Sequence, residues 1–173
     1  MAETGTIKVL IVGARYTGKG QIGRAWGQTD ADLPALQPVI LYDRYVDKNG
    51  TQLRVVAWVL SYDPEFEGIR TGLFAGADAV VYTASLVEEH VGSIDRLDDY
   101  EAELGHVLGW SPPAVVAGTV LSTEKPCDES IEERVIAWAG EHGDLPYFHL
   151  DYTDRQQFST DVRAMFMNLL GRL

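Results

Sequence analysis

The feature that most constrains the fold of this chain is a glycine loop directly after a short apolar run. Residues 6–12 read TIKVLIV and residues 13–20 read GARYTGKG. The β-branched apolar run predicts a strand that is buried on both faces. The loop resembles the phosphate-binding pattern G-x-x-x-x-G-K-[ST], in which backbone N–H groups surround phosphate oxygens and the lysine reaches the terminal phosphates. The positions that match are Gly13, Gly18 and Lys19. Gly20 replaces the Ser or Thr whose hydroxyl holds Mg²⁺, so the loop keeps its lysine and lacks one metal ligand.

An alternation of helices and strands follows the loop. Residues 19–26 predict a helix, and residues 28–37 a loop. The β-rich runs 39–46 and 52–60 predict two antiparallel strands, because Asn49-Gly50 between them is a hairpin signal. Further strands are expected at 77–84, 114–117 and 147–150, and helices at 93–108, 129–139 and 155–170. Such alternation favours right-handed crossovers and a parallel sheet with helices on both faces. We therefore predict one α/β domain over residues 1–173, with a six-stranded, mostly parallel sheet and one antiparallel edge strand.

Charge and cysteine content narrow the partners and the compartment. The chain has 26 acidic and 14 basic residues and a formal net charge of −12. This balance disfavours nucleic acid and anionic membrane, because both require basic side chains against their phosphates. Cys127 is the single cysteine, which favours a reducing compartment, and we expect a cytoplasmic protein. The ends of the chain have no signal-peptide, myristoylation or prenylation pattern, so no direct membrane anchor is expected.

The order, spacing and length of these segments resemble a Ras-superfamily small GTPase over the whole chain. Residues 42–50 look like the paired strands before the second nucleotide motif of that family. Residues 66–81 look like the Rab and Ras stretch that leads into the fourth strand, and residues 113–118 like the strand before the guanine-reading motif. The resemblance implies a P-loop NTPase fold of the small-GTPase type.

The nucleotide motifs of the family are degenerate here. The switch-I threonine that helps to hold Mg²⁺ is expected within residues 37–40, where Val39 has no hydroxyl. The D-x-x-G motif falls on residues 57–60 (AWVL), and Ser61 replaces the catalytic glutamine. The guanine-reading motif falls on residues 119–122, where Ser122 replaces the aspartate. The last motif falls on residues 151–153, where Asp151 repels a phosphate-rich ligand.

Lys19 is then the one motif side chain that remains, and the resemblance implies a Ras-like pseudo-GTPase. We expect little or no GTP binding or hydrolysis, no catalytic residue, no metal ligand and no cofactor. The residual phosphate loop consists of Gly13, Gly18, Lys19 and Gly20. The expected function is that of an interaction or scaffold module for a protein partner, within a larger complex. Residues 58–60 are apolar and either fill the vacated nucleotide site or face that partner, and Val39, Trp58 and Leu60 are the candidate contacts.

Alternative functions remain open at this point. An atypical small GTPase that still binds GTP or GDP would act as a regulatory switch. A nucleotide kinase would need an acidic residue at a strand end and an arginine-rich lid, and neither is evident. The four histidines show no metal-ligand spacing. The tryptophans Trp26, Trp110 and Trp138 are expected in or near the core.

Overall fold

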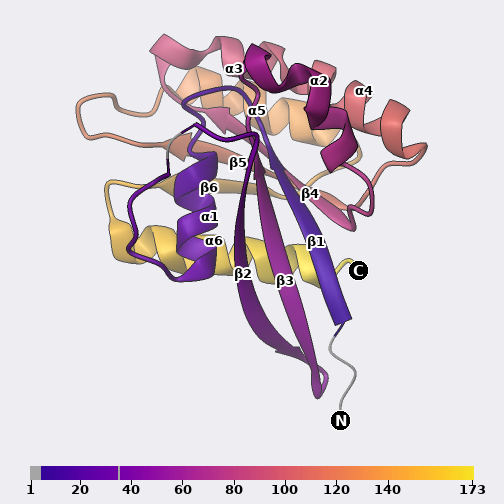
Figure 1. The fold of residues 1–173 in the computed structure, drawn as a ribbon. Coiled ribbons are helices and arrows are strands. Elements are labelled where there is room, and N and C mark those ends of the chain that lie inside the picture. The colour runs from indigo at the N-terminus through magenta and orange to yellow at the C-terminus, as the bar shows by residue number, and fades with distance from the viewer. Residues whose placement is uncertain (1–4, 35) are drawn as a thin grey trace.

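The computed structural model describes residues 5–34 and 36–173, and its centre is a six-stranded sheet (Figure 1). The strands are β1 (Gly5–Val12), β2 (Val39–Lys48), β3 (Thr51–Leu60), β4 (Ala79–Ser85), β5 (Ala114–Val120) and β6 (Tyr147–Asp151). Their order is β2-β3-β1-β4-β5-β6, and neighbouring strands are parallel except for β2 and β3. Asn49 and Gly50 turn the β2–β3 hairpin with positive φ values of 56° and 79°. The predicted mixed sheet with one antiparallel edge strand is confirmed.

Helices cover both faces of this sheet, as predicted. The longer helices are α1 (Lys19–Gly27), α4 (Leu97–Leu108), α5 (Glu129–Glu141) and α6 (Arg155–Leu170). Short helical turns are η1 (Pro64–Phe66), α2 (Glu67–Arg70), η2 (Thr71–Leu73), η3 (Glu88–His90) and α3 (Gly92–Asp95). Figure 1 shows α1 and α6 on one face of the sheet and α2 to α5 on the other. None of the helices in the described residues is both long and apolar enough to cross a bilayer.

Two apolar clusters result from the alternation of side chains along the buried strands. In β1, Val9 and Ile11 face the cluster under α1 and α6, and Leu10 and Val12 face the cluster under α4 and α5. In the first cluster, Trp26 of α1 stacks on Phe166 of α6 with 4.1 Å between ring centroids. Burial of large aromatic rings makes this stack a main contact between the two helices.

Glycine allows α1 to lie close to the sheet. A Cβ atom at Gly23 would stand 2.7 Å from Val59 Cγ2 and would also collide with the Tyr42 ring. Glycines weaken a helix by roughly 1 kcal/mol each relative to alanine. Here the close approach of α1 to β2 and β3 requires the absence of a side chain at position 23.

Two expectations differ from the structure. The helix predicted over 93–108 is divided at Arg96 into α3 and α4, and the Ser93 hydroxyl accepts a hydrogen bond from the Ser85 amide at the end of β4. Trp26 and Trp138 are buried as expected, but Trp110 is half exposed. The reason is that α4 ends at Leu108 and is capped by Gly109, whose φ is 72°, so Trp110 lies in the connection to β5 rather than on a packed helix face.

Candidate functional site at the glycine loop

Hydrogen bonds from threonine side chains fix the glycine loop between β1 and α1. The Thr17 hydroxyl hydrogen-bonds Ala14 O at 2.8 Å and the Thr83 hydroxyl of β4 at 2.6 Å. Thr119 of β5 donates its hydroxyl to Thr17 O at 2.9 Å. Gly18 adopts a left-handed conformation with φ of 78°, and no side chain caps the N-terminus of α1. The loop is therefore held on three neighbouring strands with the free N–H groups of α1 beside it.

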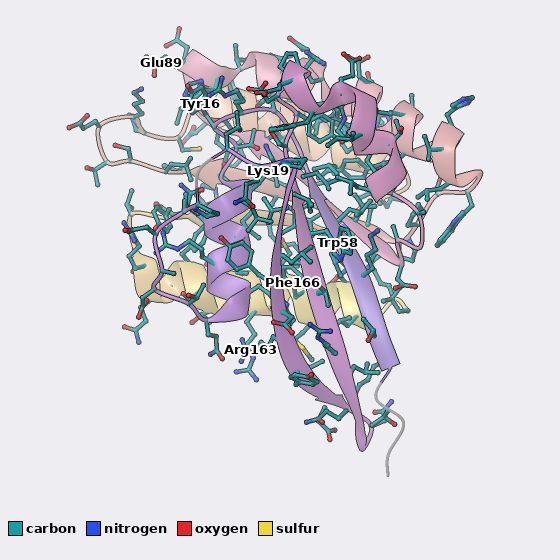
Figure 2. All side chains as sticks on the ribbon, in the orientation of Figure 1. Tyr16, Lys19, Trp58, Glu89, Arg163 and Phe166 are labelled. Carbon is teal, nitrogen blue, oxygen red and sulfur yellow. The ribbon has the colours of Figure 1, made fainter. Side chains whose placement is uncertain are left out.

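Lys19 lies inside the loop and bonds to the loop itself (Figure 2). Its ammonium donates to Gly13 O and to Ala14 O, each at 2.7 Å. Burial, together with the smaller effect of the nearby Arg15 charge, lowers the pKa of Lys19 to about 7. Within residues 5–34 and 36–173 no carboxylate forms an ion pair with Lys19. Among the described residues, the peptide carbonyls of Gly13 and Ala14 are the hydrogen-bond acceptors of this buried ammonium.

Apolar side chains fill the space in front of the loop glycines. A Cβ atom at Gly20 would stand 2.9 Å from Leu33 Cδ2, and one at Gly18 would stand 2.9 Å from Leu121 Cδ2. A cavity of about 340 Å³ lies beside the loop. Its apolar lining includes Leu33, Ile40, Val59, Leu60 and Leu121. Mg²⁺ prefers oxygen ligands, and carboxylates above all; the described lining offers hydroxyl and amide oxygens, as at Ser61 and Gln37, but no carboxylate.

The other motif positions offer no replacement for the missing ligands. Asp63 follows β3, and its carboxylate accepts a hydrogen bond from the Glu65 amide and lies 3.9 Å from Arg15 Nη1. The Asp151 carboxylate accepts bonds from the amide and the hydroxyl of Thr153. Asp63 is therefore engaged by its own turn and by Arg15 of the glycine loop, and Asp151 by its own turn.

The structure separates the three candidate partner contacts. Leu60 lines the cavity and is fully buried, so it offers no surface to a partner. Trp58 is partly buried, and Lys8 Nζ lies 3.7 Å from the centroid of its ring. Val39 is also partly buried and pairs with Leu60 in the β2–β3 register. A partner role stays a prediction for Val39 and Trp58 and does not fit the burial of Leu60.

Sequence reasoning missed an exposed apolar patch that the loop edge presents. We name it the loop-edge patch, and its members Tyr16, Leu33 and Leu36 line the cavity and are 61%, 41% and 55% exposed. Tyr16 has a φ of 63° and stacks on His90 with 4.9 Å between ring centroids. A non-glycine residue with positive φ is uncommon, so Tyr16 has an unusual backbone conformation with its ring packed on His90. The position of Tyr16 within a glycine loop was the only sequence signal for this patch.

A second group that the sequence did not predict lies at the start of α5. The ligand-type atoms of Cys127, Glu132 and His149 lie within 4.8 Å of one another. Glu132 accepts hydrogen bonds from Tyr147 Oη and His149 Nδ1 at 2.7 Å, and Cys127 Sγ lies 3.6 Å from its other oxygen. These donor types are those of a zinc ligand set. However, the hydrogen bonds of Glu132 already account for the grouping. Burial and then the Glu132 charge raise the pKa of Cys127 to about 11, which disfavours the thiolate that a zinc ion would need.

We expect the Cys127 thiol to resist alkylation in the folded protein. Its pKa of about 11, compared with 9.0 for an ordinary thiol, leaves about a hundredfold less thiolate at mildly alkaline pH. The measurement is the rate of iodoacetamide modification, with the protein unfolded in guanidinium as the reference. The variant Glu132→Gln should react faster than the wild-type protein. An equal rate in the folded and unfolded states would contradict the expectation.

Comparison with known proteins bears on the whole chain rather than on single residues. No protein-family model matches it. The chain is 21% identical to the Ras-related protein Rab-9A of Rattus norvegicus over 175 aligned positions, which cover 99% of this chain and 84% of the relative. The Homo sapiens Rab-9A gives the same identity and coverage. The chain is therefore similar to Ras-superfamily small GTPases over nearly its full length, and its mixed sheet with helices on both faces is consistent with their fold.

Proposed function

We propose that this small-GTPase-like chain is a pseudo-GTPase that acts as a protein-interaction module, with little or no GTP binding or hydrolysis. One observation carries the proposal. The Leu33 side chain stands where a Ser or Thr side chain at position 20 would project to hold Mg²⁺. Phosphoryl transfer depends on a bound metal ion and on positioned donors, with little covalent chemistry from the protein. With no hydroxyl at position 20, and with a Leu33 methyl group 2.9 Å from where its Cβ atom would stand, the loop lacks the side-chain metal ligand of that arrangement.

The state of Lys19 supports the same proposal. A lysine that serves a phosphate remains charged beside it, whereas burial moves the pKa of Lys19 toward neutrality here. Its bonds to Gly13 O and Ala14 O use the donors that a phosphate would need. No nucleotide-driven switch follows, because a switch requires a terminal phosphate that favours one of two conformations.

The partner that we propose is a protein within a larger complex. The loop-edge patch exposes apolar side chains beside the cavity, and such patches often mark protein contacts. Val39 and Trp58 extend the candidate contacts to the β2–β3 part of the sheet. The acidic charge of the chain favours a basic partner surface over nucleic acid, and the single thiol at Cys127 fits a cytoplasmic location.

An atypical small GTPase is the alternative, and the loop backbone favours it. Gly18 retains the left-handed conformation, the first turn of α1 has no acidic residue, and no side chain occupies its N-cap. Such a helix N-terminus attracts anions. Movement of Leu33 and rotation of Lys19 away from the carbonyls would then be required for nucleotide to enter.

Nucleotide content and nucleotide titration test the proposal. We expect the purified protein to carry no stoichiometric GDP or GTP, read by chromatography after heat denaturation. We also expect no micromolar binding in calorimetric titration with either nucleotide and Mg²⁺. Lys19→Ala is the matched control, because any signal that survives this change does not depend on the lysine side chain. Mg²⁺-dependent binding at micromolar or tighter affinity that Lys19→Ala abolishes would favour the alternative.

A further inference from the structure

Three arginines gather at the end of α1 that is opposite to the glycine loop. Arg24 of α1, Arg44 of β2 and Arg163 of α6 line one cavity of about 370 Å³. The chain has only 14 basic residues against 26 acidic ones. In the described part of the chain none of the three arginines forms an ion pair. Three like charges without a carboxylate partner are unfavourable unless an anion joins them.

The local contacts leave donors of these arginines available. Arg24 Nε is buried and has no hydrogen-bond partner among residues 5–34 and 36–173, and Arg24 Nη2 makes one bond of 3.3 Å to Asp30 O. The Asp30 side chain is exposed and also lines the cavity, but it does not pair with the arginines. An unpaired buried donor usually indicates an unrecognised partner, since such a group loses its hydration without compensation.

The Arg44 side chain packs against the Trp26–Phe166 stack, which fixes its position beside the cavity. Its guanidinium carbon lies 5.4 Å from the centroid of the Trp26 ring, and Trp26 rests on Phe166 in the core. Burial lowers the pKa of Arg44, and the charge of Arg163 lowers it further. Arg163 lies near the C-terminal end of α1 (Figure 2). The floor of the cavity is thus rigid, while Arg163 at its rim is exposed.

We propose that this cavity binds a phosphate monoester. Guanidinium groups present planar pairs of N–H donors that match phosphate oxygens, and a dianionic group neutralises more than one of the three charges. Ser159 of α6 adds a hydroxyl group to the lining, whereas the Thr160 hydroxyl donates to Gln156 O at 3.1 Å. The cavity volume lies in the range of small-ligand sites. The site does not involve the glycine loop, so it is independent of the proposed pseudo-GTPase function.

Titration with inorganic phosphate at constant ionic strength tests the site. We expect a saturable, one-to-one shift of the arginine Nε–H signals in the NMR spectrum, and no such shift with chloride. Arg163→Gln should weaken phosphate binding about ten- to a hundredfold, as expected for the loss of charge-assisted hydrogen bonds. Arg134→Gln is the matched control, because this substitution removes the same charge at a different place. Arg134 pairs with Asp95 on the exposed surface.

The outcomes distinguish a specific phosphate-binding site from non-specific electrostatic attraction. A response that does not saturate, or that Arg163→Gln and Arg134→Gln change equally, would overturn the proposal. Arg44→Gln provides a second variant with the same expected loss. Glycerol 3-phosphate and phosphatidylcholine vesicles with or without phosphatidic acid then identify the source. Binding of the vesicles that depends on Arg163 assigns a lipid headgroup, and binding of the soluble ester alone assigns a soluble metabolite.

Discussion

Lys19→Met should remove a large pH dependence from the stability of the folded protein. In the wild-type chain the pKa of Lys19 falls from 10.5 to about 7 on folding, chiefly because the ammonium is buried. Between these two pH values the unfolded state binds more protons, so the free energy of unfolding rises with pH. The free-energy cost of burying Lys19 is fully present below about pH 7 and is gone above about pH 10.5. We compare the free energy of unfolding of Lys19→Met with that of the wild-type protein at each pH. This difference should favour the variant by about 3–5 kcal/mol more at pH 6 than at pH 10, because one pKa unit corresponds to about 1.4 kcal/mol.

Urea denaturation of both proteins from about pH 6 to about pH 10 measures this difference. Burial also raises the pKa values of Tyr62, Tyr82 and Tyr147, and their titration cancels when the two proteins are compared. Lys125→Met is the control, because Lys125 lies on the surface beside Glu89 and should give nearly parallel curves. Parallel curves for Lys19→Met would mean that Lys19 remains charged in the fold, as it would beside a bound phosphate. The experiment therefore also tests the loop as an anion site.

Phe166→Ala should destabilise the protein by about 3–5 kcal/mol, the range for removal of a buried aromatic ring. Phe166 of α6 is fully buried (Figure 2), and its ring stacks on Trp26 of α1. The loss of the ring leaves a cavity at the centre of the cluster under α1 and α6, and the rigid sheet allows it to close only in part. Trp26 still donates its indole N–H to Val55 O at 3.2 Å, so the fold should survive with lower stability.

The neighbouring residue offers a matched control for this substitution. Met167 lies on the same helix and is 39% exposed, so Met167→Ala should change the free energy of unfolding by less than about 1 kcal/mol. Circular dichroism during urea denaturation measures both variants, with equal m values as the sign that the folded states are equally compact. A similar loss of unfolding free energy in both variants would contradict the inferred contribution of the Trp26–Phe166 stack to stability.

Local patterns along the chain predicted the strands and most of the long helices in their order. The run at 6–12, the hairpin signal at Asn49-Gly50 and the spacing of apolar residues in 155–170 each predicted an element that the structure contains. Period-two and period-3.6 patterns depend on neighbours within a few residues, so they can be read along the chain. The absence of a hydroxyl at Gly20 and at Val39 was equally plain from the residues.

The side chains that occupy the space around those residues could not be read from local patterns. Leu33 fills the position in front of Gly20, Leu121 covers Gly18, and Leu60 turns into the core rather than toward a partner. Likewise, Arg24, Arg44 and Arg163 are far apart in sequence and meet because α1, β2 and α6 pack together. Such meetings arise from long-range packing, and the packing depends on how the helices settle on the sheet. The sequence therefore determined which chemical groups the loop retains or lacks, and the fold determined which side chains fill the site and which charges gather away from it.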